Sequence, residues 1–248
     1  MCILMVIHRS VQDYPIVLAA NRDEYLDRVA DAPRRLGQSP LVWGGQDRRA
    51  GGTWLGLNAC GLLVGLTNRR TKDQAPNDPA RRSRGLLCLD VLQCRSAAEA
   101  VAWFRCEPPH RYNPFNLFIV DPLEAYWAVY DEVVQTQRLA AGMYILANGD
   151  LNDINTVRIR RARRLLEQSD CTELDILLPV LERVCRDHEV GVQDRDTICM
   201  HRPQEKYGTV SSTILAVGAD WRRSLYRYAG GAPCTTPYKD YSALFVER

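Results

Sequence analysis

The residue best suited to covalent chemistry stands at the start of the chain. Cys2 follows Met1, which methionine aminopeptidases remove when the second residue is small, as cysteine is. The resulting terminus would carry a thiol and a free α-amine on one residue. Because such an amine has a pKa of about 8, it can act as the base for its own side chain, and cysteine is the best natural nucleophile at its free pKa. The alternative is a strand-end cysteine buried for packing, which is common.

A polar cluster follows the second apolar segment of the chain, at residues 21–24 (NRDE). The apolar segments 2–8 and 15–20 predict an antiparallel hairpin, whose second strand ends near the start of the first. A carboxylate of the cluster could then hold the α-amine by a charge-assisted hydrogen bond, and its arginine could bind an anionic group. The alternative is a solvated turn with local ion pairs.

Two asparagines end later predicted strands. Asn68 follows the apolar run 61–67, and Asn148 follows 143–147. An asparagine amide at a strand end can donate to a developing oxyanion, although asparagine also suits ordinary turns. Both residues share their strand-end placement with the NRDE cluster, and this shared placement indicates a common site.

The segment 51–58 (GGTWLGLN) holds three glycines and a tryptophan. It matches neither a dinucleotide fingerprint, because no helix is predicted after it, nor a Walker A loop, because the Gly-Lys-Ser/Thr ending is missing. We predict a tight turn into a strand, in which Gly56 lets another element approach the backbone as a packing device.

Composition narrows the function classes. The chain has 248 residues, 46% of them hydrophobic and 25% charged, with a net charge of +2. These values are typical of a globular protein and disfavour a dedicated nucleic-acid role, and the arginine-rich segment 156–164 is interpreted as a solvated helix face. Residues 1–7 lack a basic signal-peptide start, and no apolar run approaches about 18 residues. We therefore expect a soluble, cytoplasmic protein with no membrane span.

Cysteine and histidine usage favours a reduced protein without a metal. The nine cysteines include no C-x-x-C pair, which argues against a disulfide framework. Cys199-Met200-His201 is a poor match to the closely spaced ligand pairs of zinc sites. The histidines show no ligand spacing, so none is assigned to a metal: His8, His110, His188 and His201.

The predicted elements alternate in blocks of strands and helix pairs. Strands are expected within 2–8, 15–20, 41–67, 115–121, 124–130, 143–147, 212–217 and 223–228. Ser83 and Ser96 are expected to cap the first two helices, and Thr172 with Asp175 resembles a capping box for the last. Two helix pairs with many antiparallel strands predict an α/β/β/α sandwich and not a Rossmann sheet.

Several motifs, in order along nearly the whole chain, resemble the NRDE family, also called the transport and Golgi organisation protein 2 family. They are MC at the start, AANRDE at 19–24, AGGTWLGLN at 50–58, GLTNRR at 65–70, SRG at 83–85, LANGDLND at 146–153 and YGTVSST at 207–213. The family's last motif often reads Y-G-T-R, whereas Val210 follows Thr209 here. Arg202 is the candidate to replace that arginine.

This resemblance implies an N-terminal-nucleophile hydrolase fold: an α+β, four-layer αββα sandwich forming a single domain over residues 1–248. It also implies a distant relation to cholylglycine hydrolases and penicillin V acylases, in which the terminal cysteine attacks an amide. Carried over, the expected catalytic residues are Cys2, Asn21, Arg22, Asp23, Asn68 and Asn148. The residues expected to support the cluster or bind substrate are Glu24, Trp54, Thr67, Arg69 and Ser211.

Two functions follow as hypotheses. The first is hydrolysis of a non-peptide C–N bond in a small substrate, with Cys2 as nucleophile, its own α-amine as proton shuttle, and no required cofactor. The second, which the family resemblance also implies, is a non-catalytic binder of haem or of an acyl-lipid or acyl-CoA. In that case Cys2 could ligate haem iron as a thiolate, although the chain has no Cys-Pro dipeptide.

Overall fold

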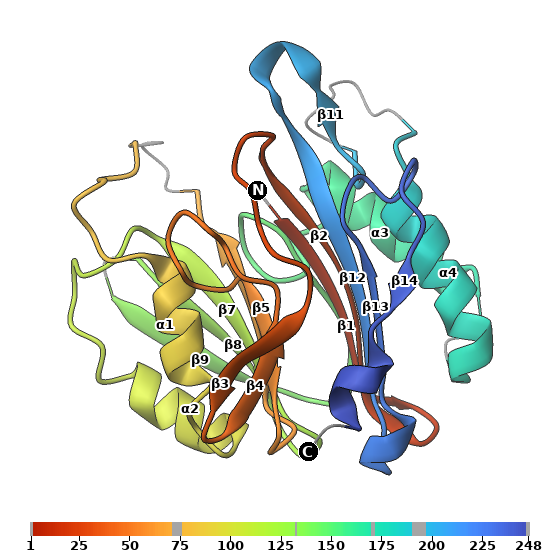
Figure 1. The fold of residues 1–248 in the computed structure, drawn as a ribbon, viewed down its shortest axis with the longest axis horizontal. Helices are drawn as coiled ribbons and strands as arrows, with labels where there is room; N and C mark the ends of the chain where they lie inside the picture. Colours follow the sequence, from red (N-terminus) through yellow and green to blue (C-terminus); the bar gives the residue numbers. More distant parts are fainter. Residues whose placement is uncertain (1, 71–75, 132, 170–171, 190–196, 247–248) are drawn as a thin grey trace. The chain divides into compact units, whose positions relative to one another are not determined.

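A computed structural model describes residues 2–70, 76–131, 133–169, 172–189 and 197–246 (Figure 1). The chain divides into two compact units, one formed by Met1–Arg28 with Ala141–Arg248 and the other by Val29–Ala140. Among the described residues, each unit contains one seven-stranded antiparallel sheet and two α-helices. None of the helices in these residues combines the length and apolar character needed to cross a membrane.

The first unit is built on the sheet that carries Cys2. Its strand order is β10-β1-β2-β12-β13-β14, and β11 pairs with β12. The strands are β1 Cys2–Val11, β2 Tyr14–Tyr25, β10 Gly142–Leu146, β11 His201–Arg202, β12 Tyr207–Val217, β13 Leu225–Ala229 and β14 Lys239–Asp240. The predicted hairpin of the first two strands is confirmed, because β1 pairs antiparallel with β2 from Cys2↔Arg22 onward.

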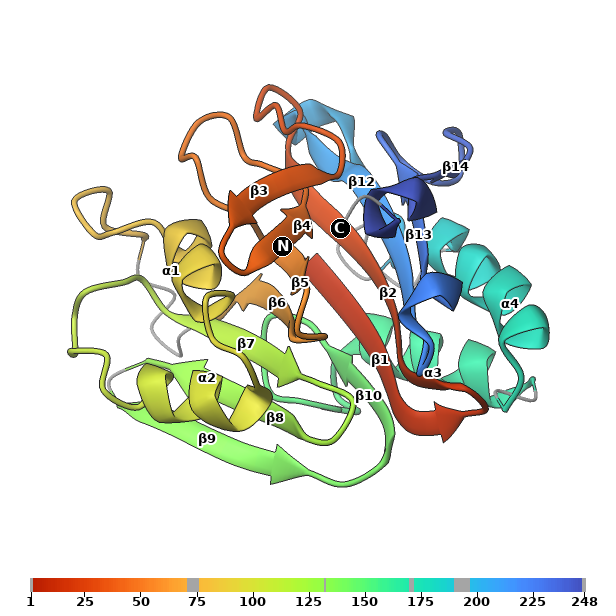
Figure 2. The same ribbon diagram turned by 60° about the horizontal axis from the view of Figure 1, so that its bottom comes forward.

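Helices α3 (Val157–Glu167) and α4 (Leu174–Arg186) cover one face of this sheet (Figure 2). Alternate strand residues such as Ile3, Ala19 and Ile214 join apolar side chains of both helices in one core. Side chains alternate between the two faces of a strand, so this core defines the helix-facing side of β1 and β2. Their remaining side chains, including that of Cys2, belong to the opposite face.

The second unit repeats this plan with a sheet of order β3-β4-β5-β6-β7-β8-β9. Its elements are β3 Arg34–Gln38, β4 Leu41–Gly44, β5 Leu55–Asn58, β6 Leu63–Asn68, α1 Arg84–Val91, α2 Ala97–Phe104, β7 Phe115–Val120, β8 Ala125–Tyr130 and β9 Val134–Leu139. The predicted role of Gly56 as a close-approach position is confirmed, because a Cβ there would lie 2.5 Å from Leu92 Cδ1.

Four strands and two caps differ from the sequence-based prediction. The short strands β11 and β14 were not expected, and Ser83 stands at the N-cap position of α1 but makes no cap hydrogen bond with its side chain. Strands β3 and β9 were not expected, because they are largely polar and exposed and lie at the edges of their sheet, held by main-chain pairing. The capping box at Thr172 is wrong: Glu173 is the N-cap of α4, and the Thr172 carbonyl accepts from Gln12 N–H instead. Ser96 does cap α2, accepting from Glu99 N–H at 3.2 Å.

Candidate active site

Three polar side chains are brought into one row across the first sheet. Cys2 lies opposite Arg22, and Arg22 lies opposite Ser211, by the strand pairing of β1, β2 and β12. On the other side of β1 the strand pairing with β10 ends at Leu4↔Leu146, and Asn148 lies two residues beyond the end of β10. Directly opposite residues point to the same face, so the row lies on the face away from α3 and α4.

A β-bulge at Val210 makes this row possible. Thr209 pairs with Asp23 and Ser211 pairs with Arg22, so the strand fits one extra residue between them. Without the bulge, Thr209 and Ser211 would share a face. With it, Thr209 turns toward the helices and Ser211 joins the row of Cys2. The extra residue of the bulge is Val210, which stands where the Y-G-T-R motif has its arginine. Because of this extra residue, the side chains of Thr209 and Ser211 point to opposite faces of the sheet.

Cys2 is half-buried at the start of β1. Burial raises the pKa of this thiol above its ordinary value, and the negative charge of Asp23 raises it further. The main-chain N–H of Asp23 donates to the sulfur, and this contact and the charge of Arg22 act in the opposite direction. With a raised pKa the thiol is protonated near neutral pH, so a nucleophilic role needs a nearby base.

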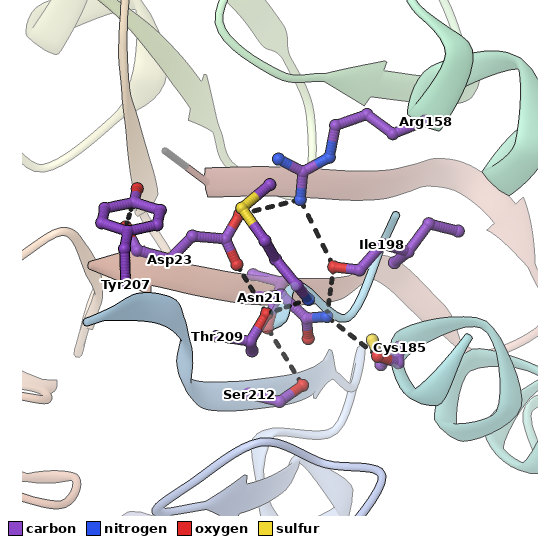
Figure 3. A network of polar contacts seen from close by, with 10 residues as sticks. Asn21, Asp23, Arg158, Cys185, Ile198, Tyr207, Thr209 and Ser212 are labelled. Carbon is purple, nitrogen blue, oxygen red and sulfur yellow. Dashed lines mark hydrogen bonds and ion pairs between the residues drawn. The ribbon is translucent and has the colours of Figure 1, made fainter. Parts of the chain in front are cut away.

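The helix-facing side of β2 holds a buried layer of polar contacts (Figure 3). The Asp23 carboxylate accepts from Thr209 Oγ1 at 2.7 Å and from Arg158 Nη2 at 2.8 Å. Both charged side chains are almost wholly buried, with 0% of Asp23 and 5% of Arg158 exposed. Tyr207 OH donates to the Asp23 carbonyl at 2.8 Å. A buried ion pair of this kind is costly to break, because either partner alone would be an uncompensated charge.

Asn21 belongs to the same helix-facing layer. Its amide donates to the carbonyls of Cys185, at 2.9 Å, and Ile198, at 3.0 Å, and so ties β2 to the end of α4 and to the segment before β11. Arg158 Nη2 shares the Ile198 carbonyl at 3.3 Å. These contacts position Asn21 and Asp23 as supports beneath the strand. Their predicted catalytic roles remain predictions.

Arg158 is the residue that sequence reasoning missed. The arginine-rich helix was interpreted as a solvated face, yet Arg158 is buried together with Ile159, Ala162 and Leu166. The signal was present in the helical spacing, because residues 158, 162 and 166 are four apart and share one face with the apolar stripe. An arginine on the buried stripe of a helix requires a buried partner, which Asp23 provides.

Glu24 and Arg202 are engaged locally. Glu24 Oε2 accepts from Arg28 Nη1 at 3.1 Å, and its Oε1 accepts from Tyr25 N–H. Arg202 forms an ion pair with Glu205 and lies over the Tyr207 ring at 5.9 Å. Arg202 is therefore joined to Asp23 through Tyr207, whose OH donates to the Asp23 carbonyl. These contacts do not join Arg202 to Cys2.

The remaining predicted residues lie in the second unit. Thr67 and Asn68 end β6, where Thr67 Oγ1 accepts from Asn116 Nδ2 at 3.2 Å. Arg69 Nη1 donates to Asn116 Oδ1 at 3.1 Å, so Asn116 joins the two. Trp54 is buried just before β5. The structure thus gathers three of these residues at one strand end within their own unit, and their expected contribution to a site with Cys2 stays a prediction.

Comparison with solved structures defines the class of protein. The structure is similar to penicillin V acylase from Agrobacterium tumefaciens, with a TM-score of 0.60 and 14% identity, over 97% of this chain and 86% of that chain. It is also similar to the Caenorhabditis elegans ortholog of N-acylethanolamine-hydrolyzing acid amidase, with a TM-score of 0.58 and 15% identity, over 88% of this chain and 94% of that chain. The predicted α+β fold of the N-terminal-nucleophile hydrolase type is confirmed.

Within that class, the chain belongs to the Transport and Golgi organisation 2 family, whose family model matches residues 1–226. The Transport and Golgi organization protein 2 homolog of Bos taurus is 29% identical over 242 residues, covering 85% of each chain. The family resemblance drawn from the sequence motifs is therefore confirmed.

Proposed function

We propose that the protein is an N-terminal-cysteine amidohydrolase that cleaves a C–N bond in a small, non-peptide amide. The observation that carries this proposal is the row of Cys2, Arg22 and Ser211 on one face of three adjacent strands. A nucleophile, a cation and a hydroxyl in one row are among the groups that acyl transfer uses. The similar folds of two proteins named as an acylase and an amidase support an amide substrate.

In the proposed reaction, removal of Met1 frees the α-amine of Cys2. This amine takes the thiol proton as the sulfur attacks the amide carbonyl carbon, and an S–C bond forms. The tetrahedral oxyanion collapses, the C–N bond breaks, and the leaving amine receives the proton from the α-amine. Water then attacks the thioester with the same amine as base, which releases a carboxylic acid and restores the thiol. These steps balance without a cofactor.

The positions of three other residues suggest their roles in this reaction. Asn148 is the proposed oxyanion donor, because it closely follows β10, the strand that pairs with the Cys2 strand β1. Arg22 is the proposed ligand for a polar or anionic group of the substrate, and its charge also favours the thiolate form of Cys2. Ser211 Oγ is buried and has no hydrogen-bond partner among the described residues, so its hydrogen-bonding capacity is unused, and we assign it to the substrate.

The test combines the intact mass of the purified protein with its turnover of two probes, an N-acylethanolamine and penicillin V. We expect Met1 to be removed and Cys2→Ala to reduce turnover by at least about 10³-fold. Cys60→Ala is the matched control, because Cys60 is exposed and lies in the second unit. Retention of Met1 on active protein, or equal turnover by Cys2→Ala and the unchanged chain, would refute the proposal.

A further inference from the structure

A second cluster of reactive side chains lies in the first unit. Cys199 Sγ is 3.6 Å from Cys234 Sγ and 3.6 Å from His201 Nε2, and His201 Nε2 is 3.1 Å from Cys234 Sγ. Ligand atoms of His188, His201 and Cys234 all lie within 4.8 Å of one another. His188, His201 and Cys234 thus form one group of ligand atoms from three segments of the chain, and Cys199 Sγ approaches two of its members, His201 and Cys234.

The three separations among Cys199, His201 and Cys234 are close to those around a tetrahedral metal ion. With bonds of about 2.3 Å to sulfur and about 2.0 Å to nitrogen, the ligand atoms of tetrahedral zinc lie about 3.3 to 3.8 Å apart. The two distances from Cys199 fall in this range, and that between His201 and Cys234 is a few tenths of an ångström shorter. A Cys₂His₂ donor set is also one that structural zinc sites use.

Hydrogen bonds hold these ligands in place. His188 Nδ1 lies 3.0 Å from the Arg186 carbonyl, which can only accept, so Nδ1 carries the proton and Nε2 is left to bind a metal. Arg161 pairs with Asp187 and Glu189, the two residues that flank His188. Cys199 N–H donates to the Asp187 carbonyl at 2.7 Å. The contacts join the end of α4 to the segment entering β11.

We propose that Cys199, Cys234, His201 and His188 form a structural site for one zinc ion. Sequence analysis predicted no metal site because Cys199-Met200-His201 is a poor match to the closely spaced ligand pairs of zinc sites and the histidines show no ligand spacing. The fold supplies the proximity instead: His188 follows α4, Cys199 and His201 lie at the start of β11, and Cys234 lies in the turn between β13 and β14.

The proposed ion would fasten the segment that supports the polar layer. Between its two ligands on that segment, Met200 N–H donates to Thr209 Oγ1 at 2.8 Å. One residue before Cys199, the Ile198 carbonyl accepts from Asn21 and Arg158. Four protein ligands leave no open position, so the ion is structural and binds whether or not Cys2 is catalytic.

The experiment uses the full-length protein, stripped by a chelator under reducing conditions and titrated with Zn²⁺ or Co²⁺. We expect one ion per chain, and for Co²⁺ the visible absorption of a tetrahedral complex together with a thiolate charge-transfer band. Cys234→Ser and His188→Gln are each expected to weaken binding by at least about 10-fold. His188 is exposed, so its variant should fold normally, and circular dichroism of the metal-free variants checks this for both.

Two control variants locate the ion. Cys106→Ser changes an exposed cysteine of the second unit and should leave affinity unchanged. Cys2→Ser should also keep the Co²⁺ spectrum, and its loss would place the ion at the chain terminus instead. Failure of the reduced protein to bind either ion, or equal affinity of His188→Gln and the unchanged chain, would overturn the proposal.

Discussion

The polar residues on the two faces of β2 differ in their contacts. On the helix-facing side, Asn21 and Asp23 are bonded to α3, α4 and β12 through contacts of 2.7 to 3.0 Å. On the other side, Arg22 lies between Cys2 and Ser211, whose hydroxyl has no hydrogen-bond partner among the described residues. The helix-facing side ties β2 to neighbouring elements, although Asn21 Oδ1 and Arg158 Nε and Nη1 have no hydrogen-bond partner among the described residues. The other side keeps the Ser211 hydroxyl unpaired in the row of the proposed nucleophile.

This difference shows that the NRDE segment is not one cluster. In a strand, consecutive residues point to opposite faces, so four adjacent polar residues divide into two pairs. We infer that Asn21 and Asp23 fix the end of β2, while Arg22 acts at the substrate face. Substitutions on the two faces should therefore separate loss of stability from loss of activity.

The largest stability effect is expected for Arg158→Met. This change leaves the Asp23 carboxylate buried without its cation, and breaking a buried pair in this way costs about 3–5 kcal/mol. Denaturant unfolding measures the loss. Arg160→Met on the exposed side of the same helix is the control, with an expected change within about 0.5 kcal/mol. If both variants lost the same unfolding free energy, the Asp23–Arg158 ion pair would contribute no more to stability than an exposed arginine does.

Arg22→Lys should lower activity without the loss of stability expected for Arg158→Met. Lysine keeps the positive charge but loses the forked geometry, so we expect kcat/KM for an accepted amide to fall about 10–100-fold, corresponding to about 1.4–2.7 kcal/mol. The unfolding free energy should change by less than about 1 kcal/mol. A stability loss as large as that of Arg158→Met, with kcat/KM unchanged, would instead place Arg22 among the structural supports.

The pH dependence of Cys2 alkylation tests whether the Asp23 charge on one face of β2 influences the pKa of the Cys2 thiol on the other. Because burial and then the Asp23 charge raise the pKa of the thiol, alkylation by iodoacetamide should keep rising with pH beyond the value of about 8.5 typical of cysteine. Asp23→Asn removes one of these causes, so the plateau should move to lower pH. Peptide mapping distinguishes Cys2 from the other cysteines. A plateau at or below pH 8.5 in the unchanged chain would contradict the assigned environment.

The smallest stability effect is expected for Ser211→Ala, which removes a buried hydroxyl without a partner. Its unfolding free energy should stay within about 0.5 kcal/mol or rise, whereas turnover should fall if the hydroxyl binds substrate. Ser212→Ala is the matched control, because its hydroxyl bonds with the Ala20 carbonyl and Tyr238 OH and should cost about 1 kcal/mol. A larger loss for Ser211→Ala than for Ser212→Ala would contradict the facing that the bulge assigns.

The sequence was informative wherever a local pattern decided the structure. Apolar runs predicted the hairpin of β1 and β2, and its length placed NRDE near Cys2. Three features lay beyond such patterns because they depend on long-range pairing: the bulge at Val210, the partnership of Asp23 with Arg158, and the approach of Cys234 to Cys199. A helical or strand period identifies which face is buried but does not name the residue that meets it.

The central claim is that Cys2, freed of Met1, forms the covalent bond with the substrate. The most direct measurement is mass spectrometry of protein quenched in acid during turnover of an N-acyl amide, followed by peptide mapping. We predict an acyl thioester on Cys2 of chains that lack Met1, and no such adduct in Cys2→Ala. Turnover that continues in chains retaining Met1, or an acyl group mapped to another residue, would contradict the account.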